Sequence, residues 1–231
     1  MANDFFQFRQ FTIHQARCAM KVGTDGTLLG AWARGGRRIL DVGTGTGLIA
    51  LMMAQRFPEA HITGIDIVPE TVCQAKENVA ASPFANRIYI IEADFTNFSA
   101  PLFDGIVSNP PYFEQSLECP DKARTLARHT TSLSYSTLME QVACQLTENG
   151  VFSVVIPTEN KSRIESEAAL KGFFKTRECA VKTTPNKPAR RYLLEFCKHP
   201  IPSFESETGI IETTPGVRSQ WYHELTKDFY L

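Results

Sequence analysis

The sequence predicts an α/β fold, in which a mainly parallel seven-stranded sheet has helices on both faces and ends in a C-terminal antiparallel hairpin. Short apolar runs alternate with stretches that carry apolar residues at helical spacing, from Arg38 to Leu170. Two final apolar runs flank a turn that contains Pro185 and Pro188. Sheets of this class bind ligands at the carboxyl ends of their strands. We expect one domain over residues 1–231.

In the first half of the chain, the expected order is strand, helix, strand, helix, strand, strand. An apolar run ends at Val42 and passes through a glycine-rich turn into a buried helix. Pro69 suits the first turn of the next helix, which has Val72, Ala75 and Val79 on one face. The four strands are expected over residues 38–42, 61–66, 87–92 and 102–107.

The second half begins with a polar stretch without a clear period, residues 113–134, which we interpret as a long substrate loop. The helix after it is predicted to start with a capping box at Thr137 and Glu140 and to end at Asn149 and Gly150. The remaining elements are a strand over 151–156, a helix over about 160–170, and two hairpin strands over about 173–182 and 190–197.

The composition argues against several classes of protein. The 24 basic and 25 acidic residues give a net charge of −1, so any positive surface for a nucleic acid must be local. The 6 cysteines form no CxxC pair and have no histidine at ligand spacing, so we expect no metal site and no disulfide framework. Free thiols suit the cytoplasm. No apolar run has the length of a membrane span, and the amino terminus does not resemble a signal peptide.

The turn after the first central strand is rich in glycine and reads Asp41-Val-Gly43-Thr-Gly45-Thr-Gly47. Glycines let the backbone approach a ligand closely, which indicates a nucleotide-like ligand, and the spacing departs from the GxGxxG of dinucleotide folds. Asp66 ends the second strand, where an acid can accept hydrogen bonds from ribose hydroxyls. After the third strand, Asp94 can accept a hydrogen bond from an adenine amino group while the Phe95 ring packs on the base.

This combination resembles the class I S-adenosylmethionine-dependent methyltransferases over about residues 37–156. The resemblance implies a Rossmann-like fold with S-adenosylmethionine as the cofactor. It also implies that Asp41 and the three glycines face the methionine part of the cofactor, that Asp66 faces the ribose, and that Asp94 and Phe95 face the adenine.

The sharpest motif, Asn109-Pro110-Pro111-Tyr112, directly follows the fourth strand, at the edge where the methyl group would lie. The amino nitrogen of a purine is a poor nucleophile because its lone pair is delocalised into the ring. The Asn109 side chain and the Pro110 backbone carbonyl can each accept one amino hydrogen, while Tyr112 stacks on the base. Positioning and electrostatics then carry methyl transfer, with no general base needed at the outset.

The motif resembles that of amino-methyltransferases that act on adenine in DNA or RNA, guanine in ribosomal RNA, or glutamine in release factors. The segments Phe11-Thr-Ile-His-Gln and Cys18-Ala-Met-Lys21-Val-Gly-Thr24-Asp25-Gly26 further resemble the start of the bacterial tRNA(Val) adenine-N6-methyltransferase family. This likeness implies methylation of the adenine 3′ of the anticodon. It also implies that residues 1–36 pack over the cofactor, with Lys21, Thr24, Asp25 and Gly26 as candidates to line its pocket.

For tRNA binding, the candidates are Pro111, Arg124, Arg128, Arg190 and Arg191. We expect a monomer or weak dimer that uses no metal. Three alternatives stay open: a glutamine-N5 methyltransferase of release factors, a guanine-N2 methyltransferase of ribosomal RNA, and a non-catalytic S-adenosylmethionine-binding module. Only about forty residues precede the glycine turn, which disfavours the glutamine enzymes because they usually carry an extra N-terminal helical domain.

Overall fold

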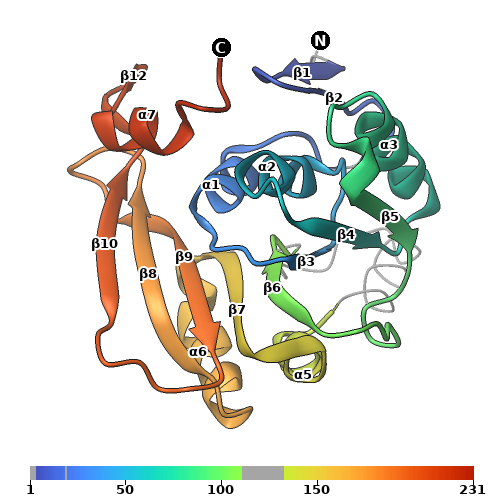
Figure 1. Cartoon of the computed structure of the whole chain (residues 1–231). Coiled ribbons are helices and arrows are strands. Elements are labelled where there is room, and N and C mark those ends of the chain that lie inside the picture. Colours follow the sequence, from blue (N-terminus) through green and yellow to red (C-terminus); the bar gives the residue numbers. More distant parts are fainter. Residues whose placement is uncertain (1–3, 19, 111–132) are drawn as a thin grey trace, which may run out of the picture.

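The computed structural model describes residues 4–18, 20–110 and 133–231. Its centre is an eight-stranded sheet in the order β10-β8-β9-β7-β6-β3-β4-β5 (Figure 1). In chain order the strands are β3 (Arg38–Val42), β4 (His61–Asp66), β5 (Ile88–Glu92), β6 (Phe103–Ser108), β7 (Leu146–Pro157), β8 (Phe174–Lys182), β9 (Ala189–Cys197) and β10 (Glu205–Ile210). All eight run in parallel apart from β9, which is antiparallel to both of its neighbours.

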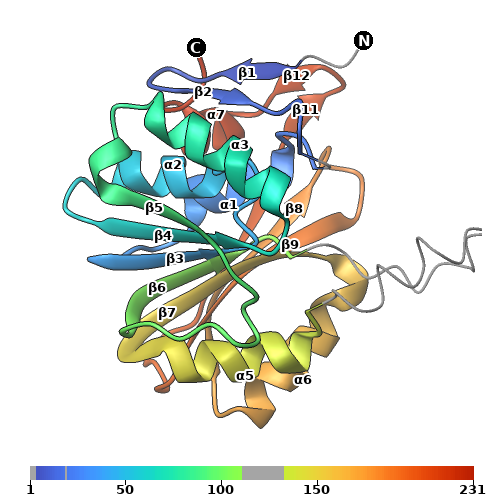
Figure 2. The ribbon, with the colours of Figure 1, turned by 90° about the vertical axis from the view of Figure 1, so that its right-hand side faces the viewer.

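Helices cover both faces of this sheet (Figures 1 and 2). They are α1 (Thr24–Trp32), α2 (Leu48–Arg56), α3 (Pro69–Ala80), α5 (Tyr135–Gln145), α6 (Lys161–Leu170) and α7 (Gln220–Thr226). The first three and α7 lie on one face, and α5 and α6 lie on the other. Apolar residues fill both layers, such as Leu29 and Ile49 on the first face and Leu138 and Phe152 on the second. Within the described ranges, no helix combines the length and apolar character that crossing a bilayer requires.

The predicted α/β class is confirmed, with one strand more than the seven expected. The hairpin formed by β8 and β9 lies where the sequence placed it, and β10 adds to its outer side in parallel with β8. Most of β10 is exposed, so it lacks the apolar pattern that marks the other strands. A short antiparallel hairpin, β11 (Glu212–Thr214) and β12 (Val217–Arg218), then leads into α7.

The bounds predicted for the helix after the long loop were wrong at both ends. Its N-cap is Ser134, whose side chain accepts a hydrogen bond from the Thr137 backbone N–H at 3.1 Å, so Thr137 lies inside the first turn. The helix ends at Gln145 because Leu146 already pairs with Phe103 in the sheet and is fully buried. Local capping signals therefore placed the start one turn late, and sheet pairing ended the helix before Asn149.

The N-terminal segment packs on the same face as α1, α2 and α3. Its strands β1 (Phe5–Gln7) and β2 (Thr12–His14) form a small antiparallel sheet. The Asn78 side chain on α3 accepts a hydrogen bond from the His14 backbone N–H at 2.9 Å and donates to the His14 carbonyl at 2.8 Å. Asn78 also donates to the Thr46 carbonyl at 2.9 Å, so it joins β2 to the glycine turn.

Candidate active site

Three parallel strands bring the predicted site residues to one edge of the sheet (Figure 2). Val42 pairs with Ile65 on one side and with Ser108 on the other, so β3, β4 and β6 end at the same level. The Ser108 hydroxyl donates to the Val42 carbonyl at 3.0 Å, which fixes the spacing of β3 and β6 where they end. Asp66 comes directly after Ile65, and Asn109 comes directly after Ser108. Residues from separate parts of the chain therefore lie together at this edge.

The glycine turn has the conformation that its composition predicts. Gly43, Gly45 and Gly47 have φ values of 70°, 56° and 82°, a left-handed region that favours glycine. The backbone N–H groups of Gly43 and Thr44 both donate to the Ile65 carbonyl at 2.9 Å, which holds the turn against β4. A Cβ built on Gly43 would meet no other atom within 4 Å. The space beside the turn is therefore open to a ligand.

Asp41 is a fully buried carboxylate beneath this turn. Its Oδ2 accepts hydrogen bonds from the Thr44 hydroxyl at 2.7 Å and from the Ala50 backbone N–H at 3.1 Å. Its Oδ1 is buried and has no hydrogen-bond partner within the described part of the chain. Burial raises the pKa of Asp41 to about 7, and the charge of Asp66 adds to the rise, although the two hydrogen bonds oppose it.

Asp66, the last residue of β4, and Asp94, which follows β5, each have only part of their hydrogen-bonding capacity filled. Asp66 accepts from the Gly45 backbone N–H through Oδ2 and from the Val68 backbone N–H through Oδ1, both at 3.0 Å. Asp94 is exposed, and its Oδ1 accepts from the Thr96 backbone N–H at 2.9 Å. A carboxylate has about four acceptor positions, so both acids retain capacity for ligand hydroxyl or amino groups.

Phe95 lies in the apolar core, with 4% of its surface exposed. It belongs to the cluster that contains Leu40, Val42 and Ile65, so most of its ring contacts the protein. The expected stacking of this ring on an adenine remains a prediction.

Asn109 lies where β6 leaves the sheet. Its Oδ1 is buried and has no hydrogen-bond partner among the described residues. A Cβ built on Gly26 would lie 3.9 Å from the Asn109 Nδ2 and 3.2 Å from the Leu48 Cδ2, so the first turn of α1 packs against the Asn109 amide. Pro110 is buried beside it. The predicted partners Pro111, Tyr112, Arg124 and Arg128 lie outside the described residues.

The other predicted residues of the N-terminal segment have varied surroundings. Lys21 is exposed, and its Nζ lies 3.9 Å from the Asp4 Oδ1. Thr24 is half-buried at the start of α1. Asp25 forms an ion pair with Arg191 of β9. Arg191 was predicted to contact tRNA, and this pairing gives it a partner within the protein. Arg190 is exposed.

Two contacts near the edge were missed by the sequence interpretation. Asn78 holds the glycine turn against β2, and Cys18 packs beside Thr71 close to Asp66, where burial raises the pKa of its thiol. A lone asparagine or cysteine gives no signal of its own, because its partners lie tens of residues away in the chain.

The residues at this edge fit S-adenosylmethionine. The open side of the glycine turn, the unpaired oxygen of Asp41 and the spare acceptor positions of Asp66 suit a ligand with an ammonium group and ribose hydroxyls. Within the described ranges, no group of three or more His, Cys, Asp or Glu side chains is placed to hold a metal ion.

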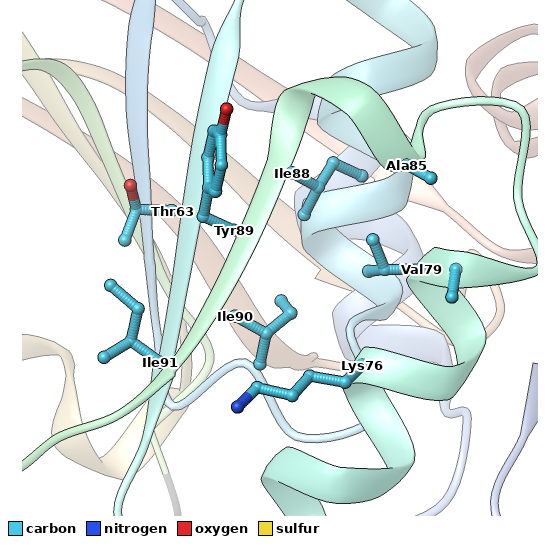
Figure 3. Close-up of a pocket in the computed structure, with 9 residues that line it drawn as sticks. Thr63, Lys76, Val79, Ala85, Ile88, Tyr89, Ile90 and Ile91 are labelled. Atoms are coloured by element: carbon cyan, nitrogen blue, oxygen red, sulfur yellow. The ribbon is translucent and has the colours of Figure 1, made fainter.

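A separate cavity of about 510 Å³ lies between α3 and the edge strand β5 (Figure 3). Ile88 and Ile90 face the helix, and Tyr89 and Ile91 face the other side of the sheet. Its wall is mostly aliphatic and includes Lys76, and none of the predicted site residues lines it. It is therefore distinct from the glycine turn and the Asn109 edge.

Comparisons with known proteins agree with this geometry. Residues 25–187 match the family model described as "Methyltransferase small domain". A protein of Bacteroides thetaiotaomicron named tRNA1(Val) (adenine(37)-N6)-methyltransferase is 48% identical over 100% of this chain and 99% of its own. A protein of the same name from Phocaeicola vulgatus is 47% identical, with the same shares covered. The crystal structure of a predicted O-methyltransferase, Atu636 from Agrobacterium tumefaciens, has a TM-score of 0.68 at 20% identity and covers 89% of this chain and 96% of that chain.

Proposed function

The chain belongs to the methyltransferase small domain family, and from this premise we propose that it transfers a methyl group from S-adenosylmethionine to the N6 amino group of an adenine in tRNA. The nucleotide is the adenine at position 37 of tRNA1(Val), the one that the names of its full-length relatives specify. The adenine lies just 3′ of the anticodon, in a single-stranded loop whose bases can be turned out at low cost.

The observation that carries this proposal is Asn109 Oδ1, a buried acceptor without a hydrogen-bond partner among the described residues. A buried polar atom without a partner costs about 1–3 kcal/mol, so proteins rarely keep one without a reason. An adenine amino group has two hydrogens. Asn109 Oδ1 accepts one of them, and the Pro110 backbone carbonyl accepts the other. Both acceptors draw the nitrogen toward tetrahedral geometry and direct its lone pair at the methyl group.

Asn109 is itself held in place from two sides. The Ser108 hydroxyl ties the end of β6 to β3, and Gly26 of α1 lies against the Asn109 amide without a side chain between them. This preorganisation matters because an acceptor fixed before the reaction needs no reorientation as charge develops on the nitrogen.

Different residues bind different parts of the cofactor. Asp41 faces the ammonium group of the methionine part, the glycine turn lies along it, and Asp66 accepts from the ribose hydroxyls. Asp94 accepts from the adenine amino group. When bound, the cofactor supplies an activated methyl group on a sulfonium, and Lys21 and Thr24 close the pocket from the N-terminal segment.

The proposed chemistry needs no metal ion, because the two acceptors and the sulfonium leaving group carry it. The enzyme acts in the cytoplasm as a monomer or weak dimer. Tyr112 stacks on the target base, while Pro111, Arg124, Arg128 and Arg190 contact the tRNA.

The proposal is tested by incubating the protein with methyl-labelled S-adenosylmethionine and tRNA that lacks this modification. Ribosomal RNA and a release factor are assayed in parallel, and nucleosides are then analysed. We expect label in N6-methyladenosine from tRNA1(Val), and none in a transcript with guanine in place of the target adenine. Label in ribosomal RNA or in the release factor, with tRNA unlabelled, would overturn the proposed substrate.

A further inference from the structure

A second cavity, of about 450 Å³, lies between the N-terminal hairpin, the start of α1 and the C-terminal helix α7. Figures 1 and 2 show the β1–β2 hairpin, α7 and the C-terminal end on the same side of the molecule, above α1 and α2. None of the glycine turn, Asp66 or Asn109 lines this cavity. We call it the terminal pocket. Its size lies within the range of small-ligand sites.

The terminal pocket is basic although the chain carries a net charge of −1. Arg9, Arg218, His223 and Lys227 line it, and no acidic side chain does so in the part of the chain that the structure describes. Lys227 is exposed and has no ion-pair partner among the described residues. Such local positive charge attracts the phosphates of a nucleic acid.

The two arginines are held at the pocket by neighbouring groups. The Arg9 Nε donates to the Tyr230 backbone carbonyl. The Arg218 guanidinium lies 4.6 Å from the centre of the Tyr222 ring and 3.3 Å from a carboxylate oxygen of Glu212. Glu212 neutralises part of the Arg218 charge, so Lys227 and Arg9 contribute most of the free positive charge.

Aromatic rings form part of the wall. Tyr222 and Tyr230 stack with their ring centres 6.1 Å apart, and their hydroxyls are hydrogen bonded at 3.0 Å. The Phe6 ring packs edge-on against Tyr230, with 5.9 Å between the ring centres. Tyr230 and Phe6 are half-buried, so each retains some exposed surface. Cationic groups beside aromatic rings are the combination that holds single-stranded RNA.

The first turn of α1 connects the terminal pocket to the active site. Gly23 and Thr24 line the pocket, and Gly26 packs against Asn109. A helix with its side chains is about 10–12 Å across. At about 3.4 Å of rise per nucleotide in a stacked strand, roughly three nucleotides cover that width.

We propose that the terminal pocket binds a phosphate and its attached nucleotide of the tRNA, a few nucleotides from the adenine that is methylated. This inference rests on the proposed function, because it takes RNA as the substrate. Lys227 and Arg9 neutralise the phosphate, and Tyr230 and Phe6 contact the ribose or base. The charged and aromatic residues of the pocket add tRNA affinity and are not among those proposed to hold the cofactor or the methylated nitrogen.

The test compares Lys227→Ala with Lys171→Ala. Lys227 is exposed in the pocket, whereas Lys171 follows α6 on the opposite face of the sheet and pairs with Glu140. Affinity for full-length tRNA is measured by fluorescence anisotropy at several salt concentrations. Steady-state methylation gives kcat and KM, and calorimetry gives the affinity for S-adenosylmethionine.

We expect Lys227→Ala to weaken tRNA binding roughly tenfold at low salt and to reduce the slope of log affinity against log salt by about 1. KM for tRNA rises by a similar factor, while kcat and cofactor affinity stay within about twofold of the wild type. Lys171→Ala leaves all five values unchanged. Wild-type tRNA affinity and an unchanged salt slope in Lys227→Ala would overturn the proposal.

Arg9→Ala, measured in the same way, provides a second variant from the other wall of the pocket. A loss of affinity in both variants supports one shared phosphate site. The wild-type assay separates the two proposals: if the wild type leaves tRNA unmethylated, the proposed function fails. If the wild type methylates tRNA and Lys227→Ala binds it normally, only the terminal pocket proposal fails.

Discussion

Asp41 and Glu195 are both fully buried carboxylates, and they lie in one row of the sheet. Asp41 pairs with Val107, Val107 with Ser153, and Ser153 with Glu195, so the two acids are three strands apart. At about 4.8 Å between neighbouring strands, their backbones are separated by about 14 Å. Each acid has one buried oxygen without a hydrogen-bond partner among the described residues, and they differ in the charged groups nearby.

Glu195 has cations within reach, whereas Asp41 has none among the residues that the structure describes. The Glu195 Oε1 accepts from the Thr176 hydroxyl at 2.8 Å and from Arg34 at 3.1 Å, and its Oε2 lies 3.6 Å from Arg177. Within the described part of the chain, Asp41 accepts only from a hydroxyl and a backbone N–H, both on one oxygen, and its other oxygen has no hydrogen-bond partner. A buried acid with its own cations joins α1 to the C-terminal strands, and a buried acid without them is suited to a ligand.

The largest loss of stability is expected at Glu195, the buried acid that has cations as partners. Glu195→Ala removes the buried partner that Arg34 and Arg177 share, although both arginines keep Glu205, so we expect a loss of about 1–3 kcal/mol in the free energy of unfolding. Urea denaturation measures it. Glu205→Ala, which removes an exposed partner of the same arginines, should cost less than about 1 kcal/mol. Equal losses in the two variants would show that burial does not set the value of the pair.

At Asn109, in contrast to Glu195, we expect a large loss of activity without a loss of stability. Asn109→Ala removes an unpaired acceptor, so unfolding should be no easier, while kcat falls by about 10²–10³-fold, as when one hydrogen bond is lost from a preorganised site. Single-turnover transfer at saturating tRNA and calorimetric binding of S-adenosylmethionine measure the two parts. Near-normal transfer by this variant would remove Asn109 from the mechanism.

A loss of stability smaller than that of Glu195→Ala is expected at Asp25, whose carboxylate is neither fully buried nor fully exposed. Its side chain is 20% exposed, that of Arg191 is 21% exposed, and the two form an ion pair next to Gly26. Asp25→Asn and Arg191→Gln should each cost about 1 kcal/mol of stability, and the double variant should cost no more than either alone. If Arg191 binds tRNA instead, Arg191→Gln alone would raise KM for tRNA and the two stability effects would add.

The sequence predicted the placement of the glycine turn and its neighbouring acids well because their signals are local. The glycine spacing from Gly43 to Gly47 and the acids directly after strands need no knowledge of distant contacts, and parallel strands bring their ends together. Asn109 was placed correctly at the end of β6 for the same reason. Its unpaired oxygen was not predictable, since it depends on the packing of α1 around it.

The C-terminal region was harder to predict because its signals are not local. β10 is mostly exposed and has no apolar pattern, so the strand was missed. The terminal pocket combines Arg9 with Lys227, which are more than two hundred positions apart in the sequence. Pairing of Arg191 with Asp25 likewise depends on the fold, and the sequence shows only an arginine in a basic hairpin.

The pH dependence of cofactor binding tests most directly whether Asp41, unlike Glu195, is a buried acid suited to a ligand. Burial raises the pKa of Asp41 from 3.8 to about 7, so the free protein holds a proton there below about pH 7, and the fold loses stability as pH rises from about 4 to about 7. The cofactor ammonium favours the carboxylate, so binding should release a proton below about pH 7.

Calorimetry from pH 5.5 to 8, in two buffers of different ionisation enthalpy, measures both the affinity and the proton release. We expect affinity to rise by up to about tenfold per pH unit below about pH 7 and then to level off, with Asp41→Asn showing no such rise. A wild-type affinity that stays constant over this range, with no proton released, would contradict the claim that the unpaired carboxylate awaits the cofactor.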